Sequence, residues 1–263
     1  NPEVLKAIKR NNISISAYRD FIDFSNNLNK DALTYTEIIL GLPLDSKERH
    51  FESLRFGIEN GVKSLSMYQA ILLPGTEMAS QKCRSDYSLT TKFRTIPGCV
   101  GIYPFLGEKH SVAEIEEVIV SSKTMPFEDY VDCRIMNLLV ETFYNNAMFE
   151  EVFALVRTIG LSVFDCLLDI KNHPEFYSSR IQEIISEFVF QTSKDLYNNQ
   201  IEAENTVLTP EVLDKYIDGE IGINELLVHK ALLYLELDEI SALLFRSIKK
   251  CLKEKKLLNP KVE

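Results

Sequence analysis

The sequence predicts an α/β segment followed by an all-α segment, and the distribution of glycine is the first observation behind this prediction. Seven of the ten glycines lie in residues 41–107, and only three follow. Two short stretches rich in β-branched and aromatic residues also lie in the first part of the chain, with a helical pattern between them. From Ser111 onward helical periodicity dominates. We therefore expect two domains, a mixed one over residues 1–110 and a helical one over residues 111–263.

Two helices are expected at the amino terminus. Asn1 can cap a helix whose first residue is Pro2, and the charge of Glu3 is favourable near the positive end of the helix dipole. A second helix is expected over residues 16–28. Its apolar pattern predicts four buried side chains, namely Tyr18, Phe21, Ile22 and Leu28.

A strand–helix–strand unit is expected next. Residues 34–40 have the composition of a strand, which Gly41-Leu42-Pro43 ends. Asp45 and Glu48 resemble a capping box for the following helix, and a second strand is expected over residues 62–73. Such a unit has parallel strands and a right-handed crossover. Because parallel sheets are covered on both faces and have more than two strands, we expect further strands upstream.

The rest of the chain is expected to contain loops and then helices. Residues 76–110 are rich in turn signals, among them Pro97-Gly98 and Gly107, and are expected to be loops. A polar loop is expected over residues 198–206. Helical periodicity predicts helices over residues 112–122, 127–145, 148–158, 162–170, 175–199, 210–217, 223–235 and 238–256.

Composition and charge exclude several classes of protein. The net charge of −10, from 29 basic and 39 acidic residues, argues against sequence-independent nucleic-acid binding, which needs Lys and Arg at the phosphates. No apolar run approaches the ~18 residues that span a bilayer, so no membrane association is expected. The start Asn1-Pro2-Glu3 has no initiator methionine and no signal-peptide pattern. We therefore expect that residues are missing upstream.

The five cysteines do not form a recognisable motif. An odd number without a close pair argues against a disulfide framework and favours the reducing cytoplasm. Cys133, Cys166 and Cys251 are expected to be small buried apolar side chains. Because the cysteines and the four histidines are scattered, the sequence predicts no metal site in this chain.

Three stretches together resemble radical S-adenosylmethionine (SAM) enzymes, most closely the branch with a cobalamin-binding domain ahead of the barrel. Residues 2–10 are similar to the helix after the fourth strand of that family, and residues 36–43 to the fifth strand and its turn. Residues 66–77 are similar to the sixth strand and the proline-glycine turn after it. The resemblance implies that residues 1–110 form the carboxy-terminal part of a partial (β/α)6 radical SAM barrel, followed by a helical domain.

The resemblance also implies the cofactors of the complete protein. In the family, three cysteines in a C-x3-C-x2-C loop hold a [4Fe–4S] cluster that binds SAM and generates a 5′-deoxyadenosyl radical. This chain contains neither that loop, nor the family's glycine-rich motif, nor a cobalamin-binding motif. The resemblance therefore implies an enzyme whose cluster and cobalamin sites lie in a missing amino-terminal half, and a chain that is inactive alone. Cobalamin-dependent methyl transfer or a related carbon-centre modification is the implied reaction.

Four residues correspond to family positions that contact the cofactor. Alternation along the first strand places Glu37, Ile39 and Gly41 on one face. The family's acidic residue four before the strand-ending glycine bonds the cofactor ribose, and Glu37 has that place. The resemblance further assigns Ile39 to the adenine, Gly41 to the turn at the rim, and Leu72 on the second strand to adenine contacts.

Other interpretations stay open for these residues. We expect Glu37 to be buried on whichever face of the strand it occupies, and it can instead form a structural ion pair with Arg19, Lys30 or another basic residue. Ile39 and Leu72 can be core residues. Arg94, in an expected loop, can reach a substrate anion or simply be solvated. For the whole protein, a non-catalytic interaction module and a cobalamin-free radical SAM enzyme are the alternatives, and no motif names the substrate.

Overall fold

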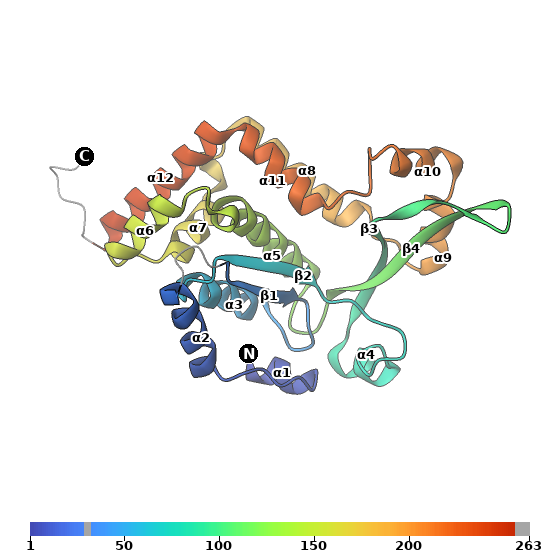
Figure 1. Ribbon diagram of the computed structural model, residues 1–263, viewed down its shortest axis with the longest axis horizontal. Coiled ribbons are helices and arrows are strands. Elements are labelled where there is room, and N and C mark those ends of the chain that lie inside the picture. The colour runs from blue at the N-terminus through green and yellow to red at the C-terminus, as the bar shows by residue number, and fades with distance from the viewer. Residues whose placement is uncertain (29–32, 256–263) are drawn as a thin grey trace.

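The computed structural model describes residues 1–28 and 33–255 of the 263-residue chain. Figure 1 shows a small parallel sheet near the centre, most of the later helices above it, the two amino-terminal helices below it, and a long β-hairpin that projects from the body. The elements up to this hairpin are, in chain order, α1 (Pro2–Ala7), α2 (Ile15–Leu28), β1 (Tyr35–Leu40), α3 (Lys47–Glu59), β2 (Ser64–Gln69), α4 (Gln81–Tyr87), β3 (Thr90–Phe105) and β4 (Glu108–Ser121).

The expected strand–helix–strand unit is confirmed. β1 and β2 pair in parallel from Tyr35 opposite Ser64 to Leu40 opposite Gln69, with α3 as the crossover. One face of the pair is buried against helices, because Ile38, Leu65 and other side chains of that face belong to the main hydrophobic core. The helix start differs by one residue from the prediction, since the side chain of Ser46, not Asp45, accepts the hydrogen bond from the Arg49 backbone N–H. 

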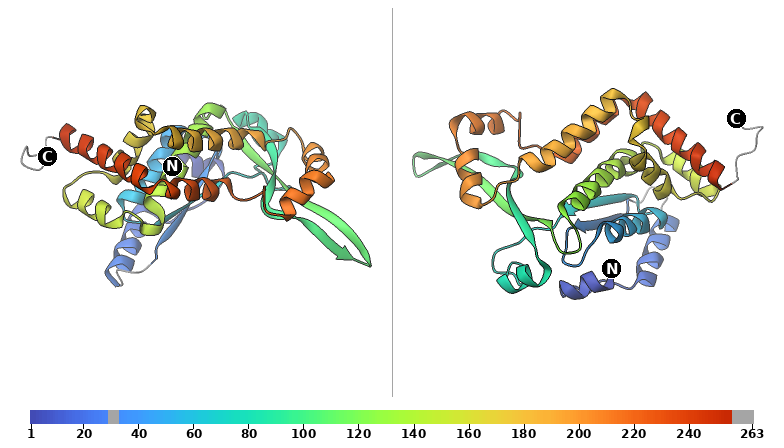
Figure 2. Two further views of the ribbon diagram at one scale, coloured as in Figure 1. Left: turned by 90° about the horizontal axis from the view of Figure 1, so that it is seen from above. Right: turned by 180° about the vertical axis from the view of Figure 1, so that it is seen from behind.

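The loops expected over residues 76–110 and the helix expected over residues 112–122 are wrong. This part of the chain forms α4 and the antiparallel hairpin β3–β4, with Thr90 opposite Ser121 and Phe105 opposite Glu108. In both views of Figure 2 the tip of the hairpin projects away from the main body, while the helical segment over residues 200–217 lies beside the hairpin. The expected domain boundary at residue 110 therefore falls inside β4, and the division into two domains stays a prediction.

The turn signals in the hairpin have two different roles. Pro97-Gly98 lies in a β-bulge, where the register shifts between Thr95 and Val100, and Gly98 has φ +76° there. The chain reverses only at Leu106-Gly107, where both residues have positive φ, as a two-residue hairpin turn requires. In β4, Val118 and Ile119 are buried in different clusters, so both faces of the strand are covered and its apolar spacing resembles that of a helix.

The helical part after the hairpin is largely as predicted. Its elements are α5 (Phe127–Leu139), the π-turn Val140–Tyr144, a 3-10 turn (Asn145–Ala147), α6 (Glu150–Thr158), α7 (Val163–Asn172), a 3-10 turn (Pro174–Phe176), α8 (Ser179–Lys194), α9 (Gln200–Val207), α10 (Pro210–Ile217), α11 (Glu225–Leu235) and α12 (Leu237–Glu254). The polar loop expected over residues 198–206 is wrong. Asn199 caps α9, and Ala203 and Val207 are buried, which gives this polar helix an apolar side.

The amino-terminal helices form as expected, but α2 leaves apolar side chains exposed. The Asn1 side chain caps α1 by accepting from the backbone N–H groups of Glu3 and Val4. On α2, Ile22 is buried, whereas Phe21 and Leu28, which we expected to be buried, are 61% and 74% exposed. The periodicity correctly predicted an apolar stripe on this helix, but within the described residues only part of the stripe packs against other side chains.

Candidate functional site

The candidate site lies on the face of β1 and β2 that the helices leave open. In the parallel register Glu37 lies opposite Ser66, and Ile39 lies opposite Tyr68. Alternation turns these side chains away from Ile38, which packs into the helical core. Tyr68 is 52% exposed on this face. The predicted division of β1 into two faces is therefore confirmed.

Glu37 is exposed, which contradicts our expectation that it is buried on either face. The cause is that the part of this face around Glu37 is left open by the described residues, and the face is covered only toward its carboxyl end, at Ile39. The alternative ion pair with Arg19 is not formed, because the Arg19 guanidinium donates to Asn60 Oδ1 at 3.0 Å. Lys30, the other partner considered, lies outside the described residues. The Glu37 carboxylate can thus accept hydrogen bonds from a ligand on the open face.

Ile39 and Leu72 pack together at the carboxyl end of the sheet. Leu72 is buried with Ala70 and Ile119, and the half-buried Ile39 packs against this cluster. The Leu72 backbone N–H donates to the Glu117 carbonyl oxygen at 2.8 Å, which binds the chain after β2 to β4. Both residues have a packing role, and their contacts to adenine stay predictions.

Gly41 occupies a position that requires glycine. Its φ of +87° is in the left-handed region, and a Cβ atom there would lie 3.2 Å from the Ile119 carbonyl oxygen. The Asp45 carboxylate accepts from the backbone N–H groups of Gly41 and Ser46. Burial raises the pKa of Asp45 to about 6. The sequence marked the turn after β1 through Gly41, but gave no sign that Asp45 would be buried inside it.

The two edges of the sheet differ. On the outer edge of β2, the Asn145 side chain accepts from the Leu65 N–H at 3.0 Å and donates to the Leu65 carbonyl oxygen at 2.9 Å. Beyond Gln69, Ala70 and Leu72 bond to Ile119 and Glu117 of β4 through even-numbered backbone groups, the set that faces β1. The outer edge of β1 has no partner strand within the described residues. Because Thr34 and Leu40 bond toward β2, alternation directs the backbone groups of Glu37 and its odd-numbered neighbours to this free edge.

A cavity of about 660 Å³ lies past the carboxyl end of β1. Pro43 and Leu44, which follow β1, form one wall, and α1 and α4 with the segment before it form the others. Four of its charged groups form ion pairs with one another, since Lys9 binds Glu77 at 2.8 Å and Lys82 binds Asp86 at 2.5 Å. The volume is typical of small-molecule sites, and ligands of α/β proteins bind at the carboxyl ends of parallel strands.

Arg94 belongs to a charge network and not to a loop. It lies in β3, where its guanidinium binds Glu116 at 2.7 Å and donates to Gln69 Oε1 at 2.6 Å. Glu225 lies 3.7 Å away and also binds the buried Arg134. With carboxylates around it, Arg94 joins the hairpin to β2 and α11. The structure thus gives it a structural role in place of the expected solvated or anion-binding one.

No protein-family model matches this sequence. The chain is similar to a 2-(S-pantetheinyl)-carbapenam-3-carboxylate methyltransferase of Streptantibioticus cattleyicolor, with 24% identity over 204 residues, 76% of this chain and 28% of that protein. It is also similar to the cobalamin-dependent radical SAM methyltransferase TokK of Streptomyces tokunonensis, with 28% identity over 133 residues, 49% of this chain and 18% of that protein. The matched regions span less than a third of these curated relatives. At this level the chain is distantly similar to radical SAM methyltransferases.

Proposed function

We propose that this chain is the carboxy-terminal part of a cobalamin-dependent radical SAM enzyme that transfers a methyl group or carries out a related carbon-centre modification. The observation that carries the proposal is the exposed Glu37 carboxylate on the open face of a parallel strand pair, in a chain similar to methyltransferases of this kind. The described residues contain no group of three or more His, Cys, Asp or Glu that could hold a metal ion. We therefore assign cluster binding to another part of the protein.

Three neighbouring features support the completion of a partial barrel by upstream strands. The outer edge of β1 is unpaired within the described chain, and one face of the sheet is open. The exposed side of α2, with Phe21, Phe24 and Leu28 at helical spacing, adds apolar surface to the same amino-terminal part of the molecule. Parallel sheets need cover on both faces, and unpaired edges bind further strands. An upstream strand beside β1, with its helix against α2, would satisfy all three.

In this proposal the residues of the chain bind and orient the nucleoside part of SAM. The exposed Glu37 carboxylate accepts hydrogen bonds from the two ribose hydroxyls. Ile39, half-buried, offers an aliphatic surface to the purine, and Gly41 lets the chain turn at the carboxyl end without a side chain. When bound, SAM and the cluster supply the radical chemistry, and cobalamin supplies the methyl-transfer chemistry.

The proposal is tested on the longer protein that contains this chain, after anaerobic reconstitution of its iron–sulfur cluster. Replacing Glu37 with Gln removes the charge and one acceptor oxygen. Hydrogen bonds to a charged group contribute about 1.5–3 kcal/mol, so we expect SAM to bind ~10- to 100-fold more weakly. Isothermal titration calorimetry measures the dissociation constant, and 5′-deoxyadenosine formation gives a second readout.

The matched control is Glu108→Gln, the same change on an exposed glutamate at the far end of the hairpin. It should leave SAM affinity unchanged. Equal affinity of E37Q, E108Q and the wild-type protein would remove Glu37 from the site. If the wild-type protein with its cluster does not bind SAM at all, the family proposal itself is wrong.

A further inference from the structure

Two of the five cysteines face each other between α7 and α12. Cys166 on α7 is fully buried, whereas Cys251 on α12 is half-buried and packs against the core cluster that contains Cys166, with the two thiols close enough to interact. We had expected Cys251 to be a buried apolar side chain, so its partial exposure is a correction. The remaining cysteines are free thiols too, but the structure shows no such thiol–thiol contact for them in the described chain.

Polar contacts fix the two helices in the register that brings the thiols together. Ser247, one turn before Cys251, donates its hydroxyl to the Cys166 carbonyl oxygen at 2.7 Å. Asp169, almost one turn after Cys166, binds Lys250 at 2.5 Å and Arg246 at 3.1 Å. Residues four apart lie on the same side of a helix, so these contacts hold the Cys251 side of α12 against α7.

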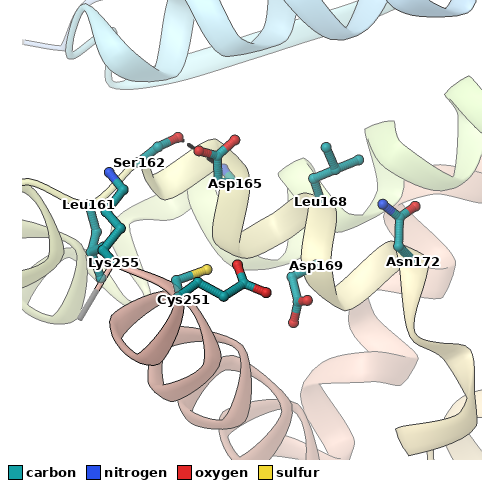
Figure 3. Close-up of a pocket in the computed structure, with 9 residues that line it drawn as sticks. Leu161, Ser162, Asp165, Leu168, Asp169, Asn172, Cys251 and Lys255 are labelled. Carbon is teal, nitrogen blue, oxygen red and sulfur yellow. Dashed lines mark hydrogen bonds between the residues drawn. The ribbon is translucent and has the colours of Figure 1, made fainter. Parts of the chain in front are cut away.

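One member of the pair is open to solvent. Cys251 lines a cavity of about 240 Å³ between the two helices, together with Asp165 and Asp169 of α7. Figure 3 shows Cys251 on α12 beside this cavity, with both aspartates projecting from the helix opposite. A small reagent can therefore reach Cys251 from the cavity, while Cys166 lies behind it in the core.

We propose that Cys251 and Cys166 form a peroxide-sensitive thiol pair that closes to a disulfide between α12 and α7. The Cys251 thiolate attacks one oxygen of hydrogen peroxide, the O–O bond breaks, and Cys251 becomes a sulfenic acid while hydroxide leaves and is protonated to water. The Cys166 sulfur then attacks the Cys251 sulfur, the S–O bond breaks, and a second water leaves with the Cys166 proton. The two thiols lose two electrons, and one peroxide is reduced to two waters.

The order of events follows from the environment of each sulfur. The hydrogen bond from Cys166 lowers the pKa of the Cys251 thiol, which favours the reactive thiolate at the exposed position. The same bond, together with burial, raises the pKa of Cys166, so this thiol stays protonated and reacts second, as the resolving cysteine. By contrast, burial raises the pKa of the Cys83 thiol on α4 and makes it less reactive than Cys251.

Peptide mapping without reductant tests the proposal on the purified native protein after treatment with one equivalent of hydrogen peroxide. We expect a Cys166–Cys251 linked peptide, loss of two of the five alkylatable thiols, and recovery of both with dithiothreitol. Cys166→Ser should stop at the sulfenic acid, which a 1,3-dione reagent labels on Cys251. Cys251→Ser should lose both products, and the matched control Cys83→Ser should keep the linked peptide.

The peptide map of the wild-type protein tests the proposal even if a variant fails to fold. A linked peptide that contains Cys83 or Cys99 in place of this pair, or five thiols that stay alkylatable after peroxide, would overturn the proposal. Because this readout needs neither SAM nor a cluster, its outcome is independent of the proposed enzymatic function.

Discussion

The outer edges of β1 and β2 differ in whether other residues hydrogen-bond to them. Along the outer edge of β2, the Asn145 side chain bonds both backbone groups of Leu65 as a neighbouring strand would. Along β1, the described residues offer no partner. The two faces repeat this contrast, with Ile38 and Leu65 in the core and Tyr35 67% exposed. Residues far apart in sequence thus complete one edge and one face of the sheet. We propose that a segment outside the described residues completes the other edge and face.

The largest difference is expected between the two faces of β2. Leu65→Ala should lower the free energy of unfolding by about 3 kcal/mol, because Leu65 is fully buried and packs on the bare backbone of Gly57. Tyr68→Ala, on the open face, should change it by less than about 0.5 kcal/mol in this chain. Urea unfolding of the two variants measures both values. A cost for Tyr68→Ala equal to that for Leu65→Ala would mean that the open face is covered in solution.

The same pair of substitutions sharpens the comparison in the longer protein. If upstream strands cover the open face, Tyr68→Ala should become more costly there than in the isolated chain, whereas the cost of Leu65→Ala should stay the same. An unchanged small cost for Tyr68→Ala in both contexts would contradict the proposed barrel.

The next largest effect is a pH dependence of the free energy of unfolding. It comes from the buried Asp45 and His50, whose shifted pKa values change stability in opposite directions. Burial raises the pKa of Asp45 from 3.8 to about 6, so its protonated form is favoured on folding and stability falls as pH rises from about 4 to 6. Burial lowers the pKa of His50 from 6.5 to about 4, so stability falls as pH drops through the same window. Each shift corresponds to about 3 kcal/mol, and in the wild-type chain the two should largely cancel.

Single substitutions separate the two titrations. Asp45→Asn should leave the His50 contribution unopposed, so that stability falls by about 2 kcal/mol from pH 6 to pH 4 relative to the wild-type profile. His50→Gln should give the opposite slope, while its amide can keep a hydrogen bond to Asn137. Thermal or urea unfolding at several pH values gives the profiles. Parallel profiles for wild type and D45N would show that Asp45 does not titrate in this window.

The sequence was most informative where the spacing of apolar residues alone decides between helix and strand. The strand–helix–strand unit and most later helices follow from local patterns, and Gly41 marked its turn correctly. The hairpin was missed because Pro97-Gly98, a strong turn signal, lies in a bulge within β3, and because β4 is covered on both faces. Its partner strand, not its own period, decides that residues 108–121 are extended.

The candidate site was likewise predictable from the sequence only in part. Alternation alone placed Glu37 and Ile39 together, opposite Ile38. Nothing local could show that Glu37 would be exposed, since this depends on which elements cover the sheet. Likewise, the contact of Asn145 with Leu65 joins residues 80 positions apart in the chain, and a single asparagine has no sequence signal for such a role.

The edge contact of Asn145 leads to the last prediction. Asn145→Ala leaves the buried N–H and carbonyl groups of Leu65 without their partner, and an unsatisfied buried polar group costs about 1–3 kcal/mol, so we expect the free energy of unfolding to drop by about 2 kcal/mol. Asn145→Asp keeps the acceptor for the Leu65 N–H but loses the donor to its carbonyl oxygen. The matched control is Asn198→Ala, which removes an exposed amide that only accepts from Lys92. If urea unfolding gives equal values for N145A and N198A, the side chain does not replace a strand at this edge, and the contrast with β1 disappears.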